Sequence, residues 1–262
     1  MLRIGSVPYL NCKPLVDWFH EEVCDVAAEV TYAVPSQLAE MLRRDETDVA
    51  NVSIFEAFQN PNLVLIPNIS ISAYSAVKSV RLFSNVPFAA IKSVALDTSS
   101  LTSAALTRIL LAEQFHITPE FVAHTPNLEK MLSQFDAGLI IGDLNLFELP
   151  ENVQVYDLGQ GWHDLTGLPF VYAAWLARTD RISPEMTPIL ETAKTWGLAH
   201  LEELAVKWAA KWNLPVDRSC DYLLNVMNYD LTPEQWQGLN LYHQKCFTHG
   251  LIPEIFPLKI AE

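Results

Sequence analysis

Four serine and threonine residues lie close together in one short segment of this chain, directly after a predicted strand. Residues 93–97 have the pattern of a buried strand, and the turn and helix start that follow contain Ser99, Ser100, Thr102 and Ser103. The first turn of a helix has unpaired N–H groups and a partial positive charge, so hydroxyls placed there favour a bound carboxylate. The segment lacks the GxxxxGK[ST] pattern that cradles a nucleotide triphosphate. One hydroxyl could simply cap the helix, but the turn holds more hydroxyls than one cap needs.

A second candidate lies in the loop after the first predicted strand. The loop reads VPYLNCKPL, and Pro8 and Pro14 stiffen it. Ligands of open α/β sheets bind beyond the carboxyl ends of the strands, which places Tyr9 and Asn11 at the expected site. The amide of Asn11 can both donate to and accept from a hydroxyl or carboxylate, so Asn11 is the candidate of this loop for contact with a ligand. The alternative is that Asn11 only caps a helix that begins near Pro14.

Three further serines are candidate substrate-binding residues. Ser53 ends the third predicted strand, although Glu56 three residues later makes a capping box an equally good interpretation. An extended run over residues 69–84 contains Ser79 and Ser84, and either side chain could reach a cleft between two lobes.

One acid and two aromatic residues complete the candidate site. Asp143 follows a predicted strand at 137–142, where it could contact a ligand or hold backbone N–H groups. Trp162 and Phe170 lie in the stretch 157–170, which also holds Gly159, Gly161 and Gly167, and the two rings could pack against a flat ligand ring. The alternative for both rings is the hydrophobic core, where most tryptophans of a globular chain lie.

The histidines and cysteines have no metal-binding or nucleophilic spacing. HxxxH and HExxH are absent, the four cysteines form no close pair, and GxSxG is missing. These absences leave zinc hydrolysis, a redox pair and α/β-hydrolase chemistry without support. Cys12 lies beside Asn11, but a nucleophilic thiol needs a base and a lowered pKa, so a buried thiol is the favoured interpretation. We expect neither a metal nor another cofactor.

The composition is that of a globular protein with an acidic surface. Of the 262 residues, 50% are hydrophobic and 18% are charged, which excludes a disordered chain. The net charge of −14 argues against nucleic acid or an anionic membrane as a partner. The N-terminal residues lack the basic segment followed by an apolar run that is typical of a signal peptide. No apolar run approaches the roughly 18 residues of a membrane span. We therefore expect a cytoplasmic protein that binds a small molecule, with its oligomeric state left open.

Strand and helix patterns alternate over the first two thirds of the chain, which predicts α/β lobes with largely parallel sheets. Predicted strands occupy residues 3–7, 28–32, 49–53, 63–67, 93–97, 121–124, 137–142 and 153–158. Longer extended runs at 69–84 and 170–178 could each cross between lobes. From Pro184 onward the pattern is helical. The expected organisation is one discontinuous lobe (1–86 and 175–262, with C-terminal helices), a second lobe (87–174) and a ligand cleft between them.

Several motifs, taken in order from residue 2 to about residue 251, resemble the chorismate dehydratase family of the futalosine route to menaquinone. The motifs are RIGSVPYLNCKPL, NVSIFEA, SVRLFS, ALDTSSLTSAAL, GLIIGD, DLGQGWHDLTGLPFVYAAW and CDYLLNVMNYDLTPEQWQGLNLYHQKCFTHGL. The resemblance implies a two-lobed fold like that of the type II periplasmic binding proteins. It also implies a hydro-lyase that converts chorismate to 3-[(1-carboxyvinyl)oxy]benzoate and water.

For this reaction the resemblance implies specific roles for two segments. The C3 proton and the C4 hydroxyl leave from the same ring face, and the ring carboxylate acidifies the C3 proton. We expect the helix start near Thr102 and Ser103 to hold that carboxylate, and Asn11 to orient the substrate near the enolpyruvyl ether or the departing hydroxyl. Since no histidine or lysine is placed as a base, our hypothesis is that the enolpyruvyl carboxylate takes the C3 proton.

This chain departs from the family at one motif, where Leu101 replaces an arginine that usually follows the serine pair. A direct arginine contact with the substrate is therefore lost, or the arginine has a structural role. Two alternatives remain open. One is an enzyme like the related 1,4-dihydroxy-6-naphthoate synthases, and the other is a protein that binds a small carboxylate without turning it over.

Overall fold

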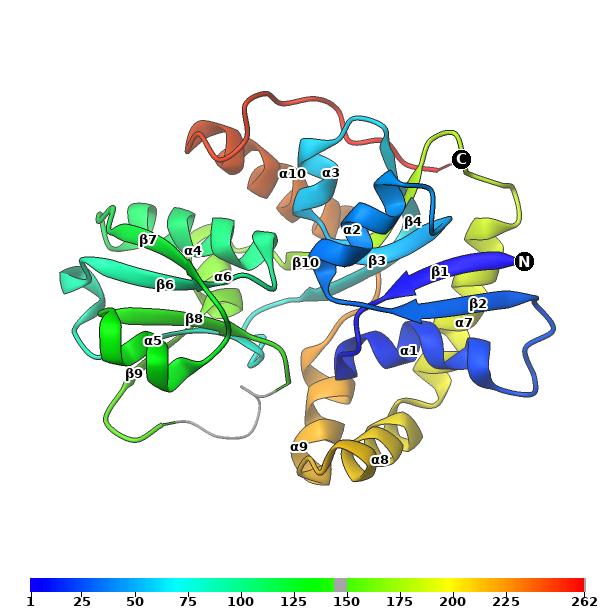
Figure 1. Cartoon of the computed structure of the whole chain (residues 1–262), viewed down its shortest axis with the longest axis horizontal. Coiled ribbons are helices and arrows are strands. Elements are labelled where there is room, and N and C mark those ends of the chain that lie inside the picture. Colours follow the sequence, from blue (N-terminus) through cyan, green and yellow to red (C-terminus); the bar gives the residue numbers. More distant parts are fainter. Residues whose placement is uncertain (144–149, 262) are drawn as a thin grey trace.

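Two five-stranded sheets lie side by side in the computed structural model, which describes residues 1–143 and 150–261 (Figure 1). The first sheet has the strand order β2-β1-β3-β10-β4. Its strands are β1 (Leu2–Ser6), β2 (Ala28–Tyr32), β3 (Val49–Ser53), β4 (Leu63–Ala73) and β10 (Phe170–Arg178). β1 runs parallel to β2 and β3, whereas β10 is antiparallel to both β3 and β4. We call this sheet with its helices the first lobe.

The second sheet repeats this plan with the order β7-β6-β8-β5-β9. Its strands are β5 (Val80–Ser84), β6 (Ser93–Asp97), β7 (Glu120–His124), β8 (Ala137–Ile141) and β9 (Gln154–Asp157). β6 is parallel to β7 and β8, and β5 is antiparallel to β8 and β9. In each lobe the antiparallel strand that enters the sheet has come over from the other lobe, so the chain passes between the lobes twice. We call this sheet with its helices the second lobe.

Helices cover the sheets and form the C-terminal third of the chain. The first lobe has α1 (Lys13–Val16), α2 (Pro35–Arg43) and α3 (Phe55–Gln59), and the second has α4 (Leu101–Gln114), α5 (Leu128–Gln134) and α6 (Leu158–Thr166). The C-terminal helices are α7 (Met186–Ala199), α8 (Leu201–Trp212), α9 (Val216–Asp221) and α10 (Pro233–Thr248). Short segments are η1 (Leu10–Cys12), η2 (Asp17–His20), η3 (Phe88–Ala90) and the π-helical η5 (Tyr222–Val226).

The α/β class and the C-terminal helices confirm the prediction from sequence, but both crossings lie earlier than expected. β5 belongs to the second sheet, and all of β10 belongs to the first. The run 69–84 is therefore two strands in different sheets, joined by residues 74–79, and the run 170–178 is a strand rather than a crossing. We propose lobe boundaries at 74–79 and 167–169 in place of residues 86 and 174.

A carboxylate holds the first crossing against the second lobe. Asp157 at the end of β9 accepts hydrogen bonds from the N–H groups of Val77 (3.0 Å) and Lys78 (2.7 Å) in the crossing. The same carboxylate caps α6 by accepting from Gly159 and Gln160. Gly159 has to be glycine because a Cβ there would lie 2.3 Å from the carbonyl oxygen of Ser75. The crossing is thus fixed by backbone contacts at the start of α6.

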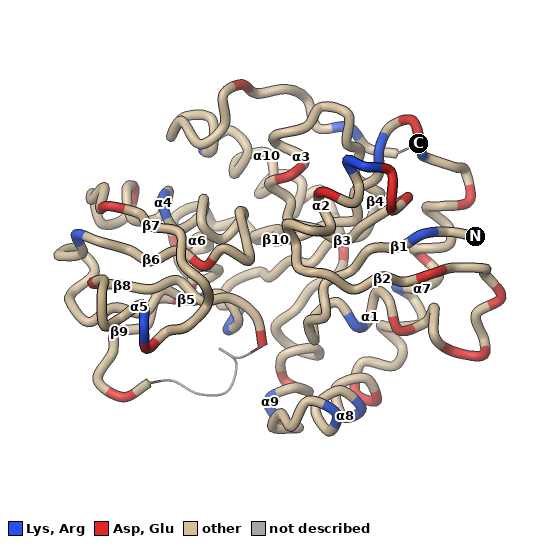
Figure 2. The backbone as a smooth tube through the Cα atoms, in the orientation of Figure 1, with Lys and Arg blue, Asp and Glu red and all other residues tan. Residues whose placement is uncertain are grey.

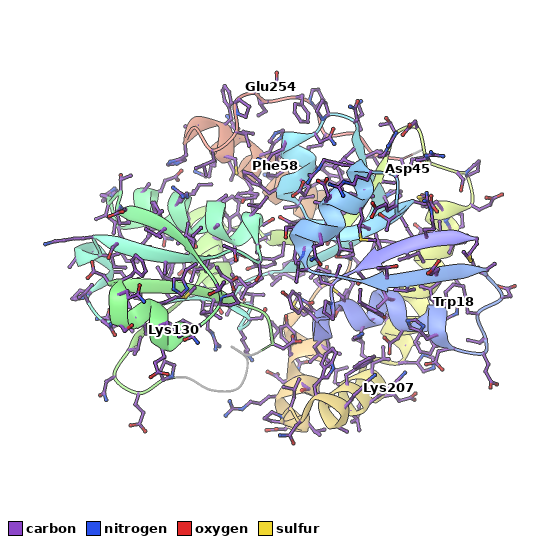
Figure 3. The ribbon with its side chains drawn as sticks, in the orientation of Figure 1. Trp18, Asp45, Phe58, Lys130, Lys207 and Glu254 are labelled. Carbon is purple, nitrogen blue, oxygen red and sulfur yellow. The ribbon has the colours of Figure 1, made fainter. Side chains whose placement is uncertain are left out.

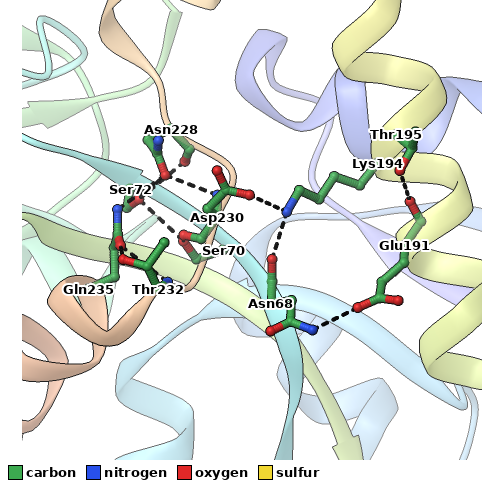
Figure 4. Close-up of polar contacts among 10 residues, drawn as sticks. All are labelled: Asn68, Ser70, Ser72, Glu191, Lys194, Thr195, Asn228, Asp230, Thr232 and Gln235. Atoms are coloured by element: carbon green, nitrogen blue, oxygen red, sulfur yellow. Dashed lines mark hydrogen bonds and ion pairs between the residues drawn. The ribbon is translucent and has the colours of Figure 1, made fainter.

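A polar network joins the C-terminal helices to the first lobe (Figure 4). Lys194 of α7 bonds both the carbonyl oxygen of Asn68 on β4 (2.7 Å) and the carboxylate of Asp230. Ser72 of β4 exchanges backbone hydrogen bonds with Asn228, just ahead of α10. These contacts fix the entry to α10 along the edge of the first sheet.

α10 in turn packs against both lobes through an aromatic cluster. The ring of Phe58 on α3, labelled in Figure 3, lies 5.4 Å from the ring of Tyr242 on α10. Trp162 of α6 and Phe170 of β10 also contact Tyr242, at 5.9 and 4.8 Å between ring centroids. This cluster is part of the continuous core that joins the two lobes.

Candidate active site

The cavity between the two lobes encloses about 590 Å³ of empty space, part of it open to solvent. Both lobes line it, the first through β3, β10 and the loop after β1, and the second through β5, the end of β8 and the start of α4. The polar residues of the lining are Tyr9, Asn11, Asn51, Ser53, Ser79, Ser100, Ser103 and Tyr172. The structure thus brings together Tyr9, Asn11, Ser53, Ser79, Ser100 and Ser103 as predicted from the sequence.

The start of α4 presents hydroxyls to the cavity. Ser100 is the N-cap, and its Oγ accepts the N–H of Ser103 at 3.1 Å. The Ser100 hydroxyl donates to Oγ of Ser103 at 3.0 Å, which leaves the Ser103 hydroxyl proton for a ligand acceptor. The partial positive charge of a helix start strengthens such a donor toward an anion. The helix start therefore offers a ligand hydroxyl groups. The N–H of Ser103, which was expected to contact the ligand directly, is already bonded to Ser100.

Thr102 and Ser53 bind each other across the lobes. Their hydroxyls lie 2.6 Å apart, and the Thr102 N–H donates to Oγ of Ser53 at 3.2 Å. Thr102 also accepts the N–H of Phe55 and the hydroxyl of Tyr242. Thr102 is fully buried and does not line the cavity. The predicted substrate contact of Thr102 is therefore replaced by a structural one, in which the start of α4 is attached to the first lobe.

Asn11 is held by a tyrosine from the C-terminal helices. Its Nδ2 donates to the hydroxyl of Tyr222 at 3.2 Å, and that hydroxyl donates to Oγ of Ser79 at 2.8 Å. Tyr222 is buried, and burial raises its pKa well above 10, so its hydroxyl stays protonated. Since the Asn11 side chain bonds this hydroxyl and makes no helix cap, the capping alternative is not the observed one. Tyr222 therefore fixes the orientation of two cavity residues.

Asp143 connects the second lobe to the loop that carries Asn11. Its Oδ2 accepts the N–H of Leu10 at 3.0 Å, and its Oδ1 is buried with no hydrogen-bond partner among residues 1–143 and 150–261. Asp143 is not in the cavity lining. Burial raises the pKa of this carboxyl from 3.8 to about 6, while the bond from Leu10 opposes the rise. Its observed role is thus to hold backbone N–H groups.

Replacing Asp143 by Asn should flatten the pH dependence of stability. A carboxyl with a raised pKa in the folded state contributes most stability below pH 4, and this contribution is lost as the pH rises to about 6. The loss amounts to at most about 3 kcal/mol for a shift of this size. Urea unfolding from pH 4 to 8 should show this decline in the wild type and not in Asp143→Asn. The same pH slope in both proteins would contradict this account of Asp143.

Besides Thr102 and Asp143, four more predicted residues lie outside the cavity lining. Trp162 and Phe170 are at most 1% exposed and pack on each other and on Tyr242, so they belong to the core rather than to a ligand wall. Ser84 is buried at the far end of β5, where its hydroxyl bonds the carbonyl oxygens of residues 86 and 136. Ser99 lies in the turn before α4, with its N–H bound to Asp97. The described lining thus excludes these four residues, and their substrate contacts stay predictions.

Leu101 and Cys12 each lie next to a predicted site residue in the sequence. Leu101, which stands where the family usually has arginine, is 45% exposed and outside the cavity lining. Cys12 does line the cavity, but burial raises its pKa to about 12. The thiol stays protonated, which agrees with its interpretation as a buried, non-nucleophilic cysteine.

Asn51, Tyr172 and Tyr222 are site residues that the sequence analysis missed. Asn51 and Tyr172 line the cavity. Asn51 is buried and has no hydrogen-bond partner among the described residues, whereas Tyr172 is half-buried. An asparagine in the middle of the strand VANVS was a usable signal, because asparagine is disfavoured in strands. Tyr222 comes from a distant helical segment, and its position in the sequence gives no indication of this contact.

Every residue that lines the described cavity is uncharged at neutral pH. The side chains are amides, hydroxyls, a thiol and apolar groups, and burial raises the pKa of Tyr9 to about 12. Lys and Arg are dispersed over both lobes rather than gathered in one region (Figure 2). A bound anion would therefore be held by neutral dipoles, which is effective in a site shielded from water.

Comparison with known proteins assigns the chain to a family. A family model described as menaquinone biosynthesis matches residues 2–248. The chain belongs to this menaquinone biosynthesis family. A curated relative, the chorismate dehydratase of Thermus thermophilus, is 33% identical over 221 residues, which cover 77% of this chain and 79% of the relative. The resemblance drawn from the sequence motifs is confirmed.

Solved structures confirm the fold. A protein of Archaeoglobus fulgidus has a TM-score of 0.77 at 15% identity, covering 96% of this chain and 98% of that chain. The periplasmic aliphatic sulphonate binding protein of Escherichia coli has a TM-score of 0.66 at 15% identity, covering 100% and 93%. A Candida albicans protein described as having the generic periplasmic binding protein fold has a TM-score of 0.66 at 12% identity, covering 98% and 92%. In the described parts of the chain, no helix is both long and apolar enough to traverse a bilayer.

Proposed function

We propose that this protein is a chorismate dehydratase, a hydro-lyase that forms 3-[(1-carboxyvinyl)oxy]benzoate and water for menaquinone biosynthesis. The observation that carries the proposal is the uncharged cavity between the lobes, in which Asn11, Ser79 and Ser103 present hydrogen-bonding groups. The relative named chorismate dehydratase supports the same substrate. Chorismate carries two carboxylates on a small ring system, and the hydroxyl and amide donors of the cavity suit such anions.

The proposed roles follow from the positions of these groups. The hydroxyl of Ser103 donates to the ring carboxylate, where negative charge grows as the C3 proton leaves. Asn11, oriented by Tyr222, holds the enolpyruvyl side of the substrate. The base is the enolpyruvyl carboxylate of the substrate itself, and the cavity selects the conformer that brings it to the C3 proton. The protein thus supplies position and dipoles.

Incubation of purified protein with chorismate tests this function and separates it from its alternatives. We expect loss of the diene absorbance and a product whose mass is lower by one water. Binding of chorismate without turnover would favour a carboxylate-binding protein, and inertness toward chorismate would favour a naphthoate synthase-like enzyme. Either of these outcomes would contradict the proposal.

A further inference from the structure

Asn51 lies in the middle of β3 with an amide that has no partner. The residue is 1% exposed and lines the cavity, and within residues 1–143 and 150–261 neither Oδ1 nor Nδ2 makes a hydrogen bond. Opposite it on β10 is Trp175, which is fully buried and whose indole N–H also lacks a partner among the described residues. Buried polar groups without partners lower the stability of a folded chain. Trp175 does not line the cavity, so of this pair only Asn51 is placed to meet a ligand.

The amide presents a donor and an acceptor next to each other, which limits the ligand group that fits. A carboxylate has acceptors only, so it could pair with Nδ2 but would face Oδ1 with the same sign of partial charge. A hydroxyl can accept from Nδ2 and donate to Oδ1 at once. An uncharged hydroxyl is therefore the group that satisfies both halves of the Asn51 side chain.

The donors that we assign to the two substrate carboxylates lie on other elements of the fold. Ser103 presents its hydroxyl from the start of α4, and Asn11 lies in the loop after β1. Ser53, two residues from Asn51 on the same strand, is already bonded to Thr102. Asn51 is thus the residue of β3 whose hydrogen-bonding capacity is left for the ligand.

We propose that Asn51 binds the substrate hydroxyl that leaves as water, a role that rests on the proposed function. In the elimination the C3–H bond breaks and its proton passes to the enolpyruvyl carboxylate. The C4–O bond breaks with its electron pair going to oxygen, and the proton then passes from the carboxyl group to that oxygen. Asn51 transfers no proton, and its Nδ2–H group donates to the oxygen as negative charge develops there.

Kinetics of Asn51→Leu and Asn51→Ala with two ligands test this role. Chorismate carries the hydroxyl, and the product 3-[(1-carboxyvinyl)oxy]benzoate has lost it but keeps both carboxylates. Both variants should lower kcat/KM for chorismate by about 10- to 100-fold. The inhibition constant of the product should change by less than about threefold, since the lost contact involves no product atom. The melting temperature of ligand-free Asn51→Leu should equal or exceed that of the wild type, because an unpaired buried amide has been removed.

Unchanged kcat/KM in both variants would overturn the proposal, as would product binding weakened as much as chorismate turnover. A lower melting temperature in both variants with unchanged kinetics would assign Asn51 a structural role instead. Inertness of the wild type toward chorismate contradicts the proposed function and not this inference. In that case, calorimetric dissociation constants of the same two ligands decide the role of Asn51 by the same criterion.

Discussion

Asn11→Ala should lower kcat for chorismate by about 100-fold, because the enolpyruvyl carboxylate would no longer be held where it can take the C3 proton. The variant should fold normally, because the Tyr222 hydroxyl keeps its bond to Ser79 when the amide is gone. Steady-state kinetics with circular dichroism spectra would measure both effects. The control is Asn225→Ala, which makes the same change at an exposed position.

Tyr222→Phe separates positioning from contact at the same site. This variant removes the hydroxyl that Asn11 and Ser79 share but leaves the amide in the cavity. We expect a fall in kcat of about tenfold, smaller than for Asn11→Ala, with little change in KM. Near wild-type turnover by Asn11→Ala would show that the amide has no catalytic role.

Ser100→Asp should nearly abolish chorismate binding while leaving the helix intact. Aspartate is as good an N-cap as serine, so the bond to the Ser103 N–H is kept. Its charge, however, would face a dianion across the cavity, and at about 5 Å this repulsion is about 3 kcal/mol per unit charge for an effective dielectric constant of about 20. We expect KM to rise by more than about 100-fold, with the effect reduced by salt.

Ser100→Asn is the matched control for this charge effect. It has the shape and capping ability of aspartate without the charge, so its KM should stay within about tenfold of the wild type. Equal losses in the two variants would show that the serine hydroxyl, rather than the neutrality of the cavity, determines binding.

The local elements of this fold could be predicted from the sequence because their patterns are short-range. The predicted strands at 28–32, 49–53 and 93–97 coincide with β2, β3 and β6. The lobe boundaries were misplaced because a continuous extended run, such as 69–84, does not indicate which sheet each half joins. Sheet membership depends on pairing with distant strands, as in the pairing of β5 with β8 and β9.

The candidate site was partly predictable for the same reason. Asn11, Ser79 and the serines of α4 follow strand ends or helix starts, which local rules locate. Trp162 was misjudged because a glycine-rich neighbourhood suggests a cleft, whereas the ring packs on residues far away in sequence such as Tyr242. Tyr222 is held beside Asn11 only by tertiary packing, and no pattern within its own segment indicates that contact.

The pH dependence of kcat tests most directly the claim that the substrate supplies its own base in an uncharged cavity. The ionisable side chains that line the cavity are Tyr9, Cys12 and Tyr172. Burial raises the pKa of Tyr9 and Cys12 to about 12 and that of Tyr172 well above 10, so none of the three changes its charge between pH 7 and 10. The account predicts a kcat that stays constant over that interval. A kcat that rises or falls tenfold per pH unit within it would require an ionising protein group in the chemical step and would contradict the account.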